Sequence, residues 1–72
     1  MATEMRRFTA HDAAGNRLVI VATRDVTGPV AGAWVYRTAD GRPVRRGTSP
    51  GIYTIEEIGR RLVTDDPNEP KD

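Results

Sequence analysis

The sequence predicts a small all-β domain, and three observations support this. Runs rich in β-branched and aromatic residues recur along the chain, and clusters of glycine, proline, aspartate or asparagine separate them, as is typical of short strands joined by turns. One such cluster contains Asp40-Gly41, a strong hairpin signal. Outside residues 55–63, nothing in the chain indicates a helix.

The length of the chain limits it to one thin core. A chain of 72 residues forms a single domain of marginal stability, because it buries only about 60% of the surface that its unfolded form exposes. It has no cysteine and one histidine, so we expect neither a disulfide nor a closed zinc site. We place the domain at residues 1–64. Residues 65–72, with four acidic side chains and two prolines, are predicted to be a disordered acidic tail.

The first half of the chain predicts two strands. Residues 5–11 form the first strand and residues 12–16 form a hairpin loop. Residues 18–22, Leu-Val-Ile-Val-Ala, follow as a continuous apolar run. Because this run does not alternate with polar residues, it predicts a central strand covered on both faces. Residues 23–32, which contain Gly28 and Pro29, form a loop.

Residues 33–38 predict a third strand that leads into the Asp40-Gly41 turn. Side chains alternate along a strand, so Trp34, Tyr36 and Thr38 share one face. We expect a type I′ turn, which has positive φ at both central residues.

Residues 42–46 return from this turn as a fourth strand, with Val44 inward and Arg45 outward. Pro43 has no N–H to give to a neighbouring strand, so it predicts that this strand lies at an edge of the sheet.

The last part of the domain is open to two interpretations. Residues 47–51 form a loop and residues 52–55 form a strand. Residues 55–63 fit a short helix, because Ile55, Ile58 and Leu62 have helical spacing and Thr54 with Glu57 matches a capping box. We prefer a turn around Gly59 followed by a last strand, since the flanking residues favour β-structure. The whole pattern predicts an antiparallel meander of five or six strands, curled toward an SH3-like, partly open barrel.

The charged residues are unevenly distributed. The net charge is +1, but residues 64–72 carry −3, so residues 1–63 carry +4. All ten basic residues of that segment are arginines. Arginine binds phosphate and stacks on aromatic rings better than lysine. A GC-rich genome is the simpler explanation, and +4 is only mildly basic for a nucleic-acid-binding domain.

One group of residues is a candidate binding surface, because small barrels bind single strands with stacked aromatics and phosphate-holding arginines. It comprises Trp34, Tyr36, Arg37, Arg45, Arg46, Tyr53, Arg60 and Arg61. The competing interpretation is that the three aromatic residues fill the core, since a short chain has few other large side chains. We favour the core interpretation.

The sequence offers no catalytic, metal or cofactor site. His11 and Ser49, the only histidine and serine, stand alone, and Glu56 and Glu57 point to opposite faces of a strand. The Gly28-to-Gly32 segment lacks the ending of a phosphate-binding loop. The longest apolar run, residues 18–22, is far shorter than the roughly 20 residues of a membrane-spanning helix. We expect a cytoplasmic protein with no cofactor and no small-molecule substrate.

Three segments resemble a group of very short bacterial β-proteins. They are the Tyr-x-Thr-x-Asp-Gly-x-x-Val pattern at residues 36–44, Gly-x-Tyr-x-Ile at 51–55 and Gly-x-x-Leu at 59–62. In that group a threonine precedes the closing glycine, where this chain has Ile58, and the loop at residues 48–50 is shorter. The resemblance implies a compact β-fold and no established activity, so it transfers no functional residue.

These observations favour a non-enzymatic binding or accessory module that acts through a protein partner or through self-association as a homodimer. Exposed sheet edges favour strand pairing, and catalytic residue groups are missing. The alternative is a nucleic-acid-binding small barrel that uses Trp34, Tyr36 and the arginines.

Overall fold

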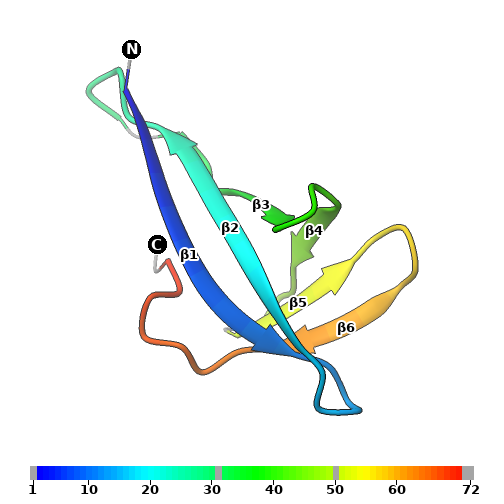
Figure 1. Ribbon diagram of the computed structural model, residues 1–72. Helices are drawn as coiled ribbons and strands as arrows, with labels where there is room; N and C mark the ends of the chain where they lie inside the picture. Colours follow the sequence, from blue (N-terminus) through cyan, green and yellow to red (C-terminus); the bar gives the residue numbers. More distant parts are fainter. Residues whose placement is uncertain (1, 31, 50, 71–72) are drawn as a thin grey trace.

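The protein is a six-stranded antiparallel barrel (Figure 1). The computed structural model describes residues 2–30, 32–49 and 51–70, and within these residues it contains no helix. The strands are β1 (Thr3–His11), β2 (Arg17–Asp25), β3 (Val35–Thr38), β4 (Pro43–Arg46), β5 (Ile52–Ile55) and β6 (Arg60–Val63). The predicted all-β meander is therefore confirmed. Ala31 and Pro50, which belong to two predicted loops, lie outside the described residues.

The sheet closes, whereas the sequence predicted a partly open barrel. Each strand pairs with the next, and β6 returns to pair with β1. That last junction is narrow, because His11 opposite Val63 is the only residue pair in register between the two strands. One backbone pair completes the ring, and no other residue of β1 pairs in register with β6.

The first two strands are much longer than the others. β1 and β2 each have nine residues and pair over their full length, from Thr3 opposite Asp25 to His11 opposite Arg17. The other four strands have four residues each. Figure 1 shows β1 and β2 as a curved ribbon that extends past β4, β5 and β6. We call its outer part, residues 3–7 and 21–25, the arm.

The core lies inside the barrel and is built around three aromatic rings. The centroids of Phe8, Tyr36 and Tyr53 are 5.0 to 6.4 Å apart, and the rings meet at steep angles, an arrangement that aromatic pairs favour. The remaining buried apolar residues are Ala10, Ile20, Ala22, Val44, Ile55 and Leu62. The core interpretation of Tyr36 and Tyr53 is therefore confirmed.

The prediction that β2 is covered on both faces is wrong. Ile20 and Ala22 are fully buried, but Val19, which precedes them and points to the opposite face of β2, is 42% exposed. A single-layered barrel covers only its inner face, so residues with the opposite orientation remain at the surface even when they are apolar.

The turn between β3 and β4 differs in type from the prediction. The N–H of Gly41 donates to the carbonyl of Thr38 at 2.9 Å, and the N–H of Thr38 donates to the carbonyl of Arg42 at 2.9 Å. Among the described non-glycine residues none has positive φ, whereas Gly41 has φ +94°. This is a three-residue loop with a glycine after the turn, because Asp40 keeps negative φ.

The prediction that β4 is an edge strand is also wrong. β4 lies between β3 and β5, and Pro43 is its first residue. Proline is tolerated at the first residue of a strand because the ladder has barely begun there. The predicted orientations of Val44, which is buried, and Arg45, which is exposed, are confirmed.

The last segment of the barrel is a strand and not the alternative helix. Residues 56–59 form a turn in which Gly59 has φ +64°, and β6 follows it. Leu62 enters the core, and the strand ends at Val63.

The acidic segment was predicted to be disordered from residue 65 onward. Instead, residues 65–70 lie against the barrel, and Pro70 is fully buried. One carboxylate oxygen of Glu69 accepts hydrogen bonds from the N–H of Gly51 at 3.1 Å and from the Tyr53 hydroxyl at 2.6 Å. We call residues 65–70 the strap. Residues 71–72 lie outside the described residues.

Candidate interaction surface

The two edges of β1 can be told apart from the hydrogen bonds at the ends of the β1–β2 pair. The N–H of Val26 donates to the carbonyl of Ala2 at 3.1 Å, and the N–H of Asp12 donates to the carbonyl of Asn16 at 3.0 Å. Because hydrogen-bonded positions alternate in an antiparallel pair, even-numbered residues of β1 bond to β2. The odd-numbered residues therefore direct their N–H and C=O groups toward the other edge.

Near the barrel, side chains cover this other edge of β1. The N–H of Thr9 donates to Asp66 Oδ2 at 2.9 Å, and Thr64 Oγ1 donates to the carbonyl of Thr9 at 2.5 Å. N–H groups of Asn68 and Thr9 lower the pKa of the Asp66 carboxyl below its usual value. Both bonds come from side chains, and they satisfy the outward N–H and C=O groups of Thr9 just beyond the end of β6. We call them, with the His11–Val63 pair, the seam.

Beyond the seam, the edge of β1 is open. Within the described residues, no hydrogen bond satisfies the outward N–H and C=O groups of Thr3, Met5 and Arg7. The opposite side of the arm is covered, because β3 pairs with β2 and the N–H of Gly32 donates to the carbonyl of Asp25 at 2.7 Å. We call Thr3, Met5 and Arg7 the open edge.

The outer face beside the open edge combines apolar and basic side chains. Its first cross-strand row is Met5, Thr23 and Val35, and its second is Arg7, Val21 and Arg37. Met5 is 56% exposed and Val35 is 50% exposed. Neither Arg7 nor Arg37 forms an ion pair with a carboxylate of the described residues. This face can therefore contact apolar and acidic groups of a partner.

The inner face of the arm carries an ion-pair network next to Trp34. Glu4 Oε1 accepts hydrogen bonds from Arg24 at 2.6 and 2.7 Å, while Oε2 lies 3.5 Å from Arg6 Nε. The hydrogen bond from Arg24, with the charges of both arginines, lowers the pKa of Glu4. The guanidinium carbon of Arg24 lies 4.5 Å from the centroid of the Trp34 ring, and that of Arg6 lies 6.0 Å from it. Cation–π contacts of this kind hold the side chains of the arm in place.

Comparison of the chain with protein-family models, with curated proteins and with solved structures gave no match. The function must therefore be argued from the geometry of this molecule. The resemblance to short bacterial β-proteins stays a prediction.

The structure does not bring the predicted aromatic and arginine residues together on one surface. Tyr36 and Tyr53 face the core, whereas Arg37 points outward from the residue next to Tyr36. Trp34 is half-buried against the core, and its Nε1 is buried without a hydrogen-bond partner in the described part of the chain. The arginines that contact Trp34 are Arg6 and Arg24, which the sequence did not indicate.

The remaining predicted arginines are distributed over the barrel. Arg45 and Arg61 flank Thr54 in one outward-facing row across β4, β5 and β6. Arg46 is half-buried opposite Tyr53. Arg60 Nη1 lies 3.3 Å from Asp12 Oδ2 and links the start of β6 to the turn after β1.

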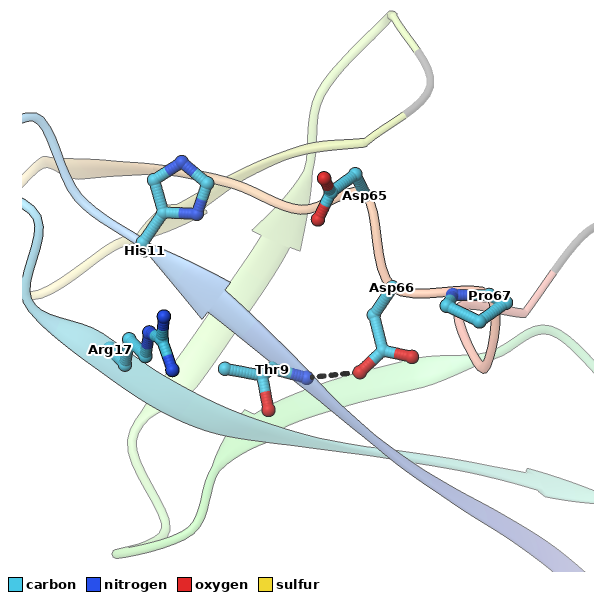
Figure 2. Close-up of a pocket in the computed structure, with 6 residues that line it drawn as sticks. All are labelled: Thr9, His11, Arg17, Asp65, Asp66 and Pro67. Carbon is cyan, nitrogen blue, oxygen red and sulfur yellow. Dashed lines mark hydrogen bonds between the residues drawn. The ribbon is translucent and has the colours of Figure 1, made fainter.

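A shallow pocket lies at the seam between the barrel and the strap (Figure 2). Thr9, His11 and Arg17 line it from β1 and β2, and Asp65, Asp66 and Pro67 line it from the strap. Neither His11 nor Arg17 forms an ion pair within the described residues. Side chains of both charge signs line the pocket, and we assign no reaction to it.

The described residues offer neither a metal-binding cluster nor a membrane-spanning helix. They contain no group of three or more histidine, aspartate or glutamate side chains that could hold a metal ion. They also form no helix with the length and apolar character needed to cross a bilayer.

The open edge was missed at the sequence level. Residues 5–11 were predicted to be a strand, but the sequence does not show which of its edges is paired. That depends on where β6 ends and on how the strap turns away, and both are tertiary features. The only local signal is Met5, an apolar residue without a core position.

Proposed function

We propose that this protein is a non-enzymatic interaction module that binds by accepting an additional β-strand at the open edge. The strand comes from a protein partner or from a second copy of the chain. The observation that supports the proposal best is the run of unpaired backbone groups at Thr3, Met5 and Arg7. Such an edge is a template for strand addition, in which backbone hydrogen bonds supply affinity.

The side chains on the outer face of the arm support the same proposal, because they would select which strand sequences bind. An added strand would place alternate side chains beside Met5 and Arg7. Met5 and Val35 favour an apolar residue there, and the unpaired Arg7 favours an acidic one. We further propose that the protein acts in the cytoplasm, as its cysteine-free sequence suggests.

Peptides from a random display library, selected on the wild-type protein, test this function. We expect selected peptides to protect the amides of Thr3, Met5 and Arg7 from hydrogen exchange. Met5→Pro should weaken their binding about 10- to 100-fold, because it removes an outward N–H and leaves a carbonyl of the peptide unpaired. The β1–β2 ladder should survive, since the N–H of Met5 takes no part in it.

Met5→Thr is the matched control, because it removes the apolar side chain and keeps the N–H. It should weaken binding less than Met5→Pro does. Peptides that bind equally well to wild type and to Met5→Pro, or that protect only amides elsewhere, would contradict strand addition at this edge.

Nucleic-acid binding is the second proposal, and the outward row of Arg45 and Arg61 is the observation that favours it. Base stacking would receive little help, because Tyr36 and Tyr53 are buried and Arg24 lies over the ring of Trp34. Titration with a single-stranded oligonucleotide at low salt tests the idea. Binding that weakens steeply with salt would favour it, and no binding at low salt would exclude it.

A further inference from the structure

We infer that the strand accepted at the open edge is β1 of a second copy, in an antiparallel arrangement whose twofold axis passes between the two facing Met5 residues. This inference rests on the proposed function and specifies its partner. It comes from the order of residues along the edge, because two antiparallel copies of this edge match in backbone groups and in charge in one register.

The register centred on Met5 uses every unpaired group of the open edge. Met5 lies opposite Met5 of the second copy, and Thr3 lies opposite the second copy's Arg7. In an antiparallel pair the odd-numbered residues would then exchange both N–H···O bonds with the residues opposite. Centring the pair on Thr3 would leave the groups of Arg7 without a partner.

The charges on the inner face select the same register. With Met5 at the centre, Glu4 lies directly opposite the second copy's Arg6, and Arg6 lies opposite its Glu4. Arg24 bonds to Glu4 Oε1, whereas Oε2 has a longer ion pair of 3.5 Å with Arg6 of its own chain, so Oε2 would exchange that contact for one with the second copy's Arg6. Opposite charges at directly facing positions stabilise a sheet.

Neighbouring registers place like charges face to face, which destabilises a sheet. A pair centred on Glu4 puts the two Glu4 side chains opposite each other. Pairs centred on Arg6 or Arg7 do the same with two arginines. The register centred on Met5 avoids all three clashes.

The seam also limits the pairing between copies to residues 3–7 of β1. Asp66 and Thr64 already occupy the backbone groups of Thr9. With Met5 at the centre, the second copy's Thr3 lies opposite Arg7, so the paired segment ends before Thr9. This five-residue segment makes a small interface, so we expect a dissociation constant on the order of tens of micromolar or above.

Cysteine cross-linking tests the register directly, because the chain has no cysteine of its own. Facing residues of a hydrogen-bonded pair have Cα atoms about 5.5 Å apart, within disulfide range. Met5→Cys alone should therefore form a disulfide-linked dimer under mild oxidation. Thr3→Cys and Arg7→Cys should cross-link when mixed, but not separately, since identical sites lie roughly 13 Å apart. Cross-linking of Thr3→Cys or Arg7→Cys alone, at the rate of Met5→Cys, would overturn the register.

Charge exchange tests the inner face in solution. Glu4→Arg and Arg6→Glu should each raise the dimer dissociation constant about tenfold, because each places like charges opposite one another. An equimolar mixture of the two variants should form a heterodimer that is tighter than either homodimer but weaker than the wild-type dimer, because Glu4→Arg also removes the bond to Arg24. Arg61→Glu, on the outward face of β6, is the matched control and should leave the dimer dissociation constant unchanged. Failure of the mixture to associate would contradict the assigned pairing.

Sedimentation of the wild-type chain up to about 1 mM separates this inference from the proposed function. A concentration-dependent dimer, with the amides of Thr3, Met5 and Arg7 protected, is the expected result. A chain that stays monomeric but binds selected peptides at the open edge would overturn self-pairing and leave strand addition intact. A chain whose edge amides neither peptides nor copies protect would overturn both.

Discussion

At the residue scale, Tyr53 and Glu69 connect the core to the strap. The Tyr53 ring is fully buried, and a buried hydroxyl needs a hydrogen-bond partner. Glu69 supplies it and also accepts the N–H of Gly51. Burial, and then the carboxylate of Glu69, raise the pKa of the Tyr53 hydroxyl above its usual value. The ring therefore stays neutral under ordinary conditions.

Tyr53→Phe should destabilise the protein by about 1.5 kcal/mol, because it removes a hydrogen bond to a charged group. Urea denaturation at pH 7 measures this loss. The raised pKa means that the hydroxyl contributes stability below about pH 10 and loses it as the pH rises further. The difference between wild type and variant should therefore shrink at pH 11. A difference that grows at high pH would contradict the bond to Glu69.

Single residues also show what the sequence could and could not predict about the site. Alternation along the strand correctly placed Trp34, Tyr36 and Thr38 on one face. The same alternation puts Arg37 on the opposite face, so aromatic and arginine residues that are adjacent in sequence point apart. The contacts of Trp34 with Arg6 and Arg24 join the residue before β3 to β1 and β2, and a local pattern does not reveal them.

At the element scale, four described glycines with positive φ lie in turns, and two of them, Gly41 and Gly51, differ in their surroundings. Gly41 has φ +94° and nothing near its Cβ position. Gly51 has φ +80°, and a Cβ there would lie 2.7 Å from the carbonyl oxygen of Thr64. Gly41 is required by its backbone conformation alone. Gly51 is required by its conformation and also because the loop before β5 packs closely against the end of β6.

Alanine substitutions at these two glycines should therefore differ. Gly41→Ala should cost about 1 kcal/mol, the usual penalty for a side chain in this region of φ. Gly51→Ala should cost about 3 kcal/mol or more, because the backbone around Thr64 must also move. Chemical denaturation of both variants gives the comparison. Equal losses would show that the close approach at Thr64 does not contribute.

The strands and turns that depend on local sequence could be predicted. The Asp40-Gly41 hairpin, the strand at residues 52–55 and the strand after Gly59 follow from turn residues and β-branched runs. The arm extends beyond its predicted limits, because Glu4 pairs with Arg24 across the two strands and stabilises ends that have weak β-propensity. The type of the hairpin turn also escaped prediction, since several loop geometries accept Asp-Gly.

At the scale of the whole molecule, carboxylates make the fold sensitive to acid. Hydrogen bonds or arginines lower the pKa of five carboxyl groups: Glu4, Asp12, Asp25, Asp40 and Asp66. A group whose pKa is lower in the folded state stabilises the fold above its unfolded value. That contribution is lost as the pH falls through the folded value.

Thermal melts should therefore show a Tm that is nearly constant from pH 7 to 5 and falls below about pH 4. Asp12→Asn should weaken this acid dependence, because Asp12 accepts bonds from Ala14 and Asn16 in the first turn and contacts Arg60. Asp65, which has no such bonds in the described residues, provides the control variant Asp65→Asn. A Tm that rises toward pH 3 would contradict the assigned hydrogen bonds.

The ordered strap could not be predicted from its composition, because the contacts that hold it are tertiary. Its composition is that of a disordered segment, but Glu69 and Asp66 find backbone and hydroxyl donors that only the closed barrel brings within reach.

Because β6 ends early, at Val63, the length of β6 determines how much of the edge of β1 stays open. If residues 65, 67 and 69 continued β6 alongside β1, the ladder would consume the outward groups of Thr9, Arg7 and Met5 in turn. Each two-residue extension of β6 would remove one docking position. Replacing the strap with a strand-forming sequence should thus convert the binding module into an inert barrel, by a change at the opposite end of the chain from the groups that bind.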